Sequence, residues 1–247
     1  MTSPILKIEG VSKYFGSFRA LTNISVDFQP DKLTAIIGPN GAGKSTFFNV
    51  ASGAFPATSG RIEFEGEDIT GLAQHKVARI GIAKSFQITN VFKQLSAHEN
   101  VRVAAQMLVS RFSLLRSRSS LGELIEKADV LLARVGLTQE RNKRAADLAH
   151  GQQRALEVAM ALACDPKLLL MDEPTAGMSP EETVVMMNLI TSLSSERTVI
   201  LVEHKMKLVM GICERLIVLH QGELLAEGTP DEIRHNIDVK RVYLGKN

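Results

Sequence analysis

The chain has 247 residues, of which 45% are hydrophobic and 23% charged, and its formal net charge is +2 at pH 7. This composition is ordinary for a soluble globular protein, and the length suits one α/β domain with a smaller subdomain. The weak positive charge gives no argument for a nucleic-acid partner, no apolar run approaches the roughly 20 residues that cross a bilayer, and the N-terminal residues lead us to expect no secretory signal.

The first 30 residues predict antiparallel strands. Residues 5–11 are rich in apolar side chains, a turn is expected at Gly16 and Ser17, and residues 23–28 alternate apolar and polar side chains. Such alternation is typical of a half-buried strand in an antiparallel sheet.

The most informative motif of the chain comes next. Residues 33–37 (Leu-Thr-Ala-Ile-Ile) predict a buried strand, residues 38–46 match G-x-x-x-x-G-K-[ST], and a helix is predicted from residue 44 to 52. In this setting glycines let backbone N–H groups converge on a phosphate, and the helix N-terminus favours its negative charge. Lys44 is then placed to reach the β- and γ-phosphates of a nucleotide, and the Ser45 hydroxyl to bind Mg²⁺. The nucleotide-binding residues predicted here are Gly38, Pro39, Asn40, Gly41, Ala42, Gly43, Lys44, Ser45 and Thr46.

Beyond this motif the character of the sequence changes. Short strands are predicted at residues 60–66 and 82–86, with a short helix between them at 72–79. Helical patterns then dominate, at residues 98–110, 121–135 and 151–163. We therefore expect residues 88–160 to form a helical subdomain, inserted into a nucleotide-binding core of residues 1–87 and 161–247 that includes the antiparallel strands. The basic, serine-rich segment 111–120 is either a solvated connector or a contact for lipid headgroups or a partner.

After residue 164 strands and helices alternate again. Strands are predicted at residues 167–171, 198–202, 215–219 and 223–227, and helices at 180–193 and 206–213. This alternation predicts a mostly parallel sheet with helices on both faces. Cys164 and Cys213 lack metal-ligand spacing, and we expect them to be reduced core thiols of a cytosolic protein.

Chemically active side chains follow three of the predicted strands. Asp172 and Glu173 end one apolar run, Gln87 follows another, and His204 a third. Ligands of α/β proteins bind where parallel strands end. Asp172 can hold Mg²⁺ directly or through water, and Glu173 can act as general base on an attacking water. Gln87 is either a Mg²⁺ ligand or a solvated amide, and His204 either contacts a γ-phosphate or is structural.

The order of these elements resembles that of the ATP-binding subunits of ATP-binding-cassette (ABC) transporters over almost the full length of the chain. The resemblance implies an α/β P-loop fold with a mostly parallel central sheet, an N-terminal antiparallel β-subdomain and an inserted helical subdomain. It implies ATP and Mg²⁺ as cofactors, with Glu173, His204 and Gln87 as catalytic residues and Ser45, Gln87 and Asp172 as metal ligands. It also implies that Tyr14 stacks on adenine, although an isolated tyrosine often packs into a core.

A signature segment of the family corresponds to residues 148–152, Leu-Ala-His-Gly-Gln. In the family it is usually Leu-Ser-Gly-Gly-Gln and contacts the ATP held by the other subunit of a dimer. The further nucleotide-binding candidates are therefore Ala149, His150, Gly151 and Gln152. Ala149 has no hydroxyl and His150 adds bulk, so the segment either makes an altered but usable contact or belongs to a degenerate site that depends on a better partner. Ser179 stands where the family often has an Asp at the dimer seam.

At these positions the sequence resembles the ATPases of high-affinity branched-chain amino acid importers. Importers of urea and short amides share the same motifs. The similar segments are residues 148–154, 172–180, 202–210 and 228–245. The resemblance implies an ATPase that powers such an importer from the cytoplasmic face of the membrane. Two alternatives from other classes are a low-turnover regulatory ATP-binding partner and a non-transport ABC protein.

The resemblance also implies partners. These are a second ATPase subunit in a homo- or heterodimer, a membrane permease, and a solute-binding protein that is met only through the permease. The expected permease contact is the groove of residues 88–99. Val91, Phe92 and Leu95 are either apolar anchors for a permease helix or packing for the helical subdomain.

Overall fold

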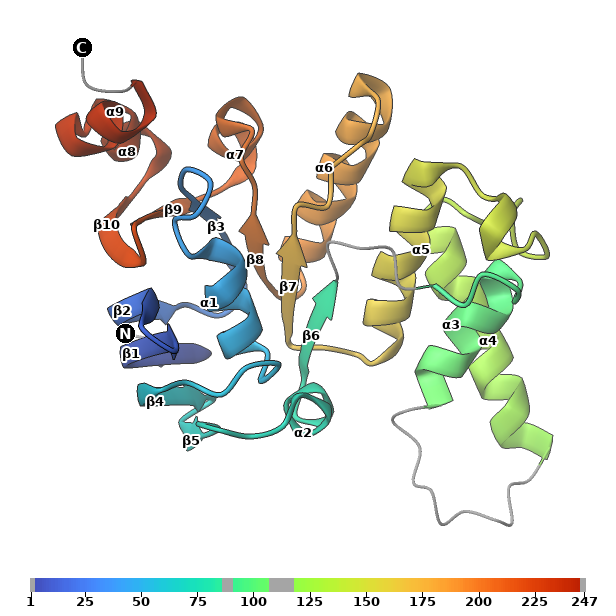
Figure 1. Ribbon diagram of the computed structural model, residues 1–247. Helices are drawn as coiled ribbons and strands as arrows, with labels where there is room; N and C mark the ends of the chain where they lie inside the picture. Colours follow the sequence, from blue (N-terminus) through green and yellow to red (C-terminus); the bar gives the residue numbers. More distant parts are fainter. Residues whose placement is uncertain (1–2, 86–90, 107–117, 245–247) are drawn as a thin grey trace.

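The computed structural model describes residues 3–85, 91–106 and 118–244. Figure 1 shows two sheets around a central helix, with a group of helices at the opposite end of the molecule from the C-terminus. The arrangement is the α/β fold that the sequence predicts, with one antiparallel and one mostly parallel sheet.

The antiparallel sheet has four strands in the order β2-β1-β4-β5. They are β1 (Leu6–Phe15), β2 (Phe18–Phe28), β4 (Ser59–Phe64) and β5 (Glu67–Asp68). Phe15 and Phe18 are paired at the end of the first hairpin, where Gly16 adopts a φ of +60°. The strands of this hairpin therefore extend further than residues 5–11 and 23–28, up to the predicted turn.

The second sheet has six strands in the order β10-β9-β3-β8-β7-β6. They are β3 (Leu33–Ile37), β6 (Ile82–Ser85), β7 (Leu168–Asp172), β8 (Thr198–Val202), β9 (Arg215–His220) and β10 (Glu223–Gly228). Only the β9–β10 pair is antiparallel. Every residue of β3, β7 and β8 is buried, because helices or strands cover both faces of this sheet.

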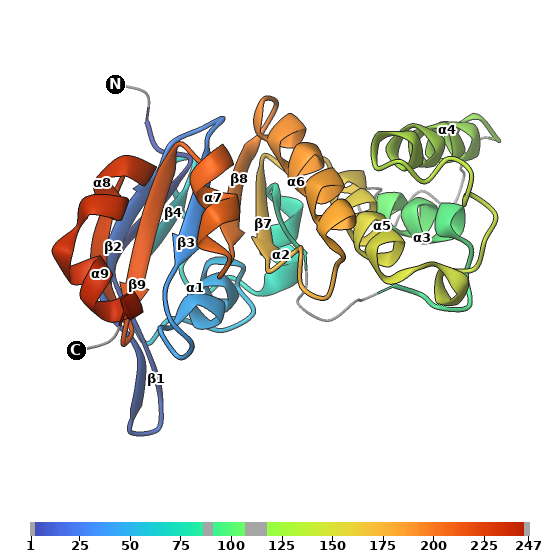
Figure 2. The same ribbon diagram turned by 90° about the horizontal axis from the view of Figure 1, so that it is seen from above.

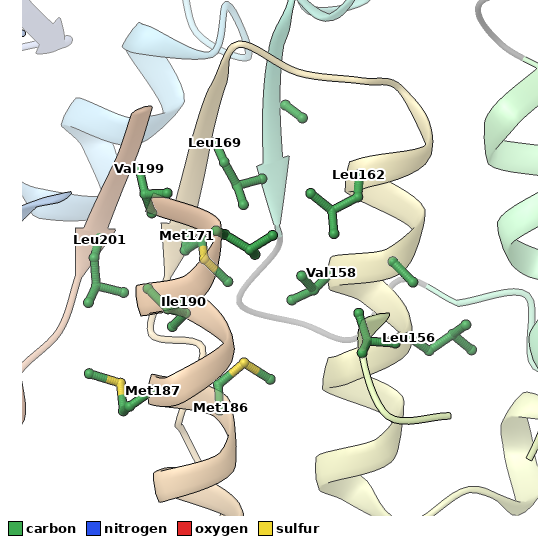
Figure 3. Close-up of a cluster of buried hydrophobic side chains, with 14 of the residues drawn as sticks. Leu156, Val158, Leu162, Leu169, Met171, Met186, Met187, Ile190, Val199 and Leu201 are labelled. Carbon is green, nitrogen blue, oxygen red and sulfur yellow. The ribbon is translucent and has the colours of Figure 1, made fainter. Parts of the chain in front are cut away.

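Two hydrophobic clusters occupy the two faces of the parallel sheet. Along β7, Leu169 and Met171 join one cluster, while Leu168 and Leu170 join the other. Figure 3 shows the first cluster, in which side chains of α5 and α6 pack over β7 and β8. The second contains the rings of Phe47 and Phe48 from α1 and the inner face of the antiparallel sheet. The alternation of side chains along each strand thus fixes which helix covers which face.

The helices that flank the sheets are α1 (Lys44–Ala51), α2 (Gln74–Arg79), α6 (Pro180–Ser194), α7 (Met206–Ile212), α8 (Pro230–His235) and α9 (Ile237–Leu244). The sequence analysis did not predict α8 and α9. Thr229 begins α8 with a capping box, in which its side chain accepts from the Glu232 N–H and Pro230 occupies the first turn. That Thr-Pro-Asp-Glu pattern is a helix-start signal that the sequence carries.

The remaining helices are α3 (Ala97–Ala105), α4 (Arg118–Arg134), α5 (His150–Ala163) and a short 3₁₀ turn (Ala145–Asp147). They pack against one another beyond β6, as the view from above shows (Figure 2). Arg141, in the loop after α4, binds the carboxylate of Asp129 on α4. No helix in the described ranges is long and apolar enough to cross a membrane.

Candidate functional site

Three strand ends converge at one edge of the parallel sheet. β3, β8 and β7 are consecutive neighbours and run parallel, so the segments that follow them meet at the same edge. These segments carry Lys44, Asp172, Glu173 and His204. Gln87, which follows the next strand, β6, lies outside the described residues, and its predicted role stays a prediction.

The phosphate loop is a tight turn that uses the freedom of glycine. Gly41 and Gly43 have φ angles of +78° and +100°, which disfavour other residues. At Gly43 a Cβ would also lie 2.8 Å from the carbonyl oxygen of Ala20, so a side chain has no room there. The helix α1 starts directly after this glycine, and its first-turn N–H groups point toward the loop. The arrangement suits an anion.

The Lys44 amine is folded back onto the loop that precedes it. Its Nζ donates to the carbonyl oxygens of Gly38 at 2.8 Å and Pro39 at 3.0 Å. Burial lowers the pKa of Lys44, while the nearby carboxylates of Glu173 and Asp172 raise it. A cation is thus held at the centre of the site, next to two acids.

Asp172 is buried at the end of β7, with 3% of its surface exposed. Its Oδ1 atom has no hydrogen-bond partner among the described residues. Burial raises the pKa of Asp172, and the ammonium groups of Lys84 and Lys44 lower it. A buried carboxylate oxygen without a protein donor fits a divalent cation, which would supply the missing positive charge. The described residues contain no group of three or more His, Cys, Asp or Glu side chains arranged for a metal.

Sequence reasoning missed Lys84 as part of this site. Its Nζ donates to the Asn49 side chain at 2.6 Å from within β6, and burial lowers its pKa while Asp172 raises it. A lysine in the middle of a short apolar strand carries no motif, so only the adjacency of β6 and β7 reveals that it faces Asp172.

Glu173 and His204 lie close together above the strand ends. Glu173 has a φ of +48°, a left-handed conformation that is uncommon for a side-chain-bearing residue, and its N–H donates to the Val202 oxygen at 2.9 Å. The His204 Nδ1 is 3.7 Å from the Glu173 Oε1, and half of the His204 side chain is exposed. Strained backbone of this kind often marks a functional position.

The carboxylate of Glu203 connects the loop after β7 to the loop after β8. The sequence analysis did not identify this residue as part of the site. Glu203 has no exposed surface, and its Oε1 accepts from the Thr175 hydroxyl at 2.5 Å. Its Oε2 accepts from the His204 N–H at 3.2 Å. Thr175 follows β7 and His204 follows β8, so Glu203 ties the two loops together. The acid next to a candidate histidine was the only signal in the sequence.

The signature segment forms the N-terminus of α5. Ala149 and His150 are exposed, and the Gln152 side chain accepts from the Ala149 N–H at 3.0 Å. The His150 ring lies against the backbone of Gly177, where a Cβ would be 3.1 Å from its Cε1. Ala149 provides no side-chain cap. An open helix N-terminus therefore faces the surface beside the loop that follows Glu173.

Tyr14 is half-buried near the end of β1, with the guanidinium of Arg19 5.8 Å from the centre of its ring. The neighbouring rings of Phe15 and Phe18 are 44% and 65% exposed. Phe15 also meets Phe55 edge-on at 5.5 Å. The hairpin tip thus presents phenylalanine rings that sequence reasoning missed, and the role of Tyr14 stays a prediction.

The predicted permease groove is described from residue 91 onward. Val91 packs against the hydrophobic core, whereas 52% of Phe92 is exposed. The Phe92 N–H donates to the buried Asn100 side chain at 2.7 Å, which fixes this turn to α3. Elsewhere, a mostly apolar cavity of about 330 Å³ lies between α2, β6, α3 and α5, lined in part by His75, Met160 and Cys164. Most of the basic segment 111–120 lies outside the described residues.

The sequence of this chain is similar to those of known transport proteins. A family model described as "ABC transporter" matches residues 21–176, and one described as "Branched-chain amino acid ATP-binding cassette transporter" matches residues 223–247. The high-affinity branched-chain amino acid transport ATP-binding protein BraF of Pseudomonas aeruginosa is 42% identical over the full length of both chains.

Solved structures agree with the sequence matches. The ADP conformation of MJ1267, an ATP-binding cassette of an ABC transporter, is 31% identical and covers 99% of this chain and 100% of its own, with a TM-score of 0.87. A dimeric post-hydrolysis state of the ATP-binding cassette MJ0796, bound to ADP and Pi, is 27% identical, with coverage of 91% and 98% and a TM-score of 0.79.

Proposed function

The chain belongs to the ABC transporter family, and from that premise we propose that it binds and hydrolyses ATP to power an importer of branched-chain or related amino acids. The observation that carries this proposal is the meeting of Lys44, Asp172, Glu173 and His204 at one sheet edge. The full-length similarity to BraF supports the solute class.

In the proposed mechanism each residue acts from its place in the fold. The phosphate loop holds the ATP phosphates with its N–H groups, and Lys44 exchanges the carbonyls of Gly38 and Pro39 for the β- and γ-phosphates. Ser45 and Asp172 would hold Mg²⁺, together with Gln87. When bound, Mg²⁺ neutralises charge that develops on the phosphates.

Glu173 is placed as the general base that takes a proton from the attacking water. His204, 3.7 Å from it, is placed to orient Glu173 and to contact the γ-phosphate. The hydrogen bonds of Glu203 to Thr175 and to the His204 N–H would hold the loops after β7 and β8 together during the reaction. Release of the γ-phosphate would then remove a contact of His204.

We place a second ATPase subunit opposite the phosphate loop, with the α5 N-terminus of one subunit facing the ATP of the other. The exposure of Ala149 and His150 supports this arrangement, as does the dimeric form of the related MJ0796. A membrane permease would dock at residues 88–99 and hold the chain at the cytoplasmic face of the membrane. The exposed ring of Phe92 supports this site.

A second candidate function is that of a low-turnover ATP-binding partner within a heterodimer. The observation that favours it is Ala149, which offers no hydroxyl to a phosphate held by the other subunit. One lost hydrogen bond of this kind costs about 1 kcal/mol.

The deciding experiment measures ATP hydrolysis by the purified chain against protein concentration, with Mg²⁺ and with EDTA. We expect Mg²⁺-dependent turnover that rises faster than linearly with concentration, since each site needs two subunits. Turnover that is strictly proportional to concentration would contradict the shared site. ATP binding without any turnover would favour the low-turnover partner.

A further inference from the structure

The loop after β7, residues 173–179, lies against the N-terminus of α5 in the same chain. A Cβ at Gly177 would have the His150 ring as its nearest neighbour beyond the adjacent residues, with Cε1 at 3.1 Å, Nδ1 at 3.6 Å and Nε2 at 3.7 Å. Gly177 also has a φ of +75°, which disfavours other residues. The imidazole of the signature segment therefore lies over the loop of its own subunit.

A second contact joins the same two segments. A Cβ at Gly151 would lie 2.4 Å from the Oε1 atom of Glu182, so the absence of a side chain lets this carboxylate lie against the start of α5. The other carboxylate oxygen, Oε2, accepts from the Ser179 N–H at 2.9 Å in the capping box of α6. The starts of α5 and α6 are thus joined through two consecutive residues, His150 and Gly151.

A cavity lies beside these contacts. It is mostly apolar, has a volume of about 620 Å³ and lies between α4, α5 and α6. Gly151 and Gln152 line it from α5, and Glu182 and Met186 line it from α6. Because side chains do not fill this space, the position of the α5 N-terminus depends strongly on the contacts of His150 and Gly151.

The loop connects the His150 contact to the residues that we place at the reacting water. The Ala176 N–H donates to the Glu173 oxygen at 3.0 Å, which makes the start of the loop a compact turn. The Thr175 hydroxyl donates to the carboxylate of Glu203 at 2.5 Å, and His204 is the next residue. A displacement of this turn would therefore act on Glu173 and on His204.

We propose that His150 is a positioning residue for the active site of its own subunit. Its ring holds the loop after β7 and, through that loop, the pair formed by Glu173 and His204. This role rests on the proposed function, in which Glu173 is the general base. It is separate from the contact of the exposed α5 N-terminus with the ATP of the other subunit. A movement of α5 would then change the rate of hydrolysis within the same subunit.

The first test uses mixed dimers of the full-length chain, isolated through two different affinity tags. One subunit carries Glu173→Gln, so that hydrolysis takes place at the other subunit, against the signature segment of the Glu173→Gln subunit. His150→Ala is placed either in the subunit that keeps Glu173 or in the Glu173→Gln subunit. We expect kcat to fall about three- to tenfold in the first arrangement, because the base is less well oriented, with an unchanged Kd for ATP. The second arrangement should hydrolyse ATP at the rate of the dimer without His150→Ala.

Two further variants sharpen this test. His150→Phe keeps a flat ring over Gly177 and should restore most of the rate in the first arrangement, which it would not do if the imidazole nitrogens contacted a phosphate. His75→Ala removes an exposed histidine of α2 and should leave the rate unchanged. The role is overturned if the slower dimer is the one with His150→Ala in the Glu173→Gln subunit, or if both arrangements hydrolyse ATP at the same rate.

A second measurement needs neither ATP nor a dimer. Hydrogen exchange is followed at the amides of Ala176 and Met178, whose N–H groups bond within the turn. His150→Ala should make both exchange at least about threefold faster, and His75→Ala should not. Unchanged exchange in His150→Ala would overturn the contact. Failure of the unmodified chain to hydrolyse ATP would instead overturn the proposed function, and the exchange rates would still decide whether His150 holds the loop.

Discussion

At the scale of single residues, Glu173 combines a left-handed backbone with a side chain aimed at His204. If it removes the proton from water, Glu173→Gln should lower turnover by about 10²–10⁴ and leave ATP binding intact, because the amide keeps the shape but cannot accept the proton. Steady-state hydrolysis and ATP titration check this. Glu67→Gln, at an exposed position on β5, is the matched control and should hydrolyse at the normal rate. Unchanged hydrolysis by Glu173→Gln would exclude the role of base.

The predictability of the site also differs residue by residue. Lys44, Asp172 and His204 stand at motif positions after apolar strands, so their convergence follows from the parallel order of the sheet. Lys84 and Glu203 could not be recognised in this way, because their importance lies in contacts between strands or loops that local patterns do not encode. Gln87 lies outside the described residues and stays a prediction.

At the scale of elements, the start of α6 shows what Ser179 does in place of the Asp common in the family. Its side chain accepts from the Glu182 N–H, and the Glu182 carboxylate accepts from the Ser179 N–H. Ser179→Ala should destabilise the protein by about 1 kcal/mol, because the cap is lost, whereas Ser179→Asp should keep it. Thermal unfolding measures the difference. Ser192→Ala, on the exposed face of the same helix, serves as control, and an equal loss of Tm in Ser179→Ala and Ser192→Ala would contradict the capping role.

A second prediction concerns the helices beyond β6 and their dependence on pH. Arg141 binds Asp129 with two donors, and His98 lies 3.6 Å from the same carboxylate. The hydrogen bond from Arg141 lowers the pKa of Asp129 below 3.8, although partial burial opposes it. A lowered pKa means that the ionised form stabilises the fold at higher pH, and that this contribution is lost as the pH falls through the lowered value.

Asp129→Asn should therefore reduce the Tm at pH 7 and lose its effect in acid, as the pH falls through the lowered pKa of Asp129. The effect is small, because Asp129 is partly exposed and surface pairs contribute little. Differential scanning fluorimetry across this pH range provides the measurement. Glu123→Gln, an exposed residue of α4, should leave the pH profile unchanged. A Tm difference that persists at low pH would point to packing rather than charge.

At the scale of the whole molecule, the buried strands were the most predictable part of the fold. β3 and β8 have the bounds that the sequence predicts, because continuous apolar runs between turns leave few alternatives. The predicted helix at 151–163 begins one residue earlier in the structure, at His150, and the predicted helix at 180–193 ends one residue later, at Ser194. α8 and α9 were missed because six- and eight-residue helices lack a sustained apolar period. The contacts of Leu219 and Gly222 with the phosphate loop join residues that are far apart in the sequence, which no local pattern contains.

The strand order carries a consequence for how this protein is made. β3 lies between β8 and β9, so both of its hydrogen-bonding neighbours are synthesised long after it. On the ribosome, the phosphate loop emerges next to an unpaired strand. At that point it lacks its backbone contacts with Leu219 and Gly222. Long-range pairing of this kind must await the translation of β8 and β9, and it makes assembly slower than folding from local contacts. The nucleotide site is thus completed long after its phosphate loop has been translated, and a nascent chain truncated before β9 lacks the backbone contacts that Leu219 and Gly222 make with that loop.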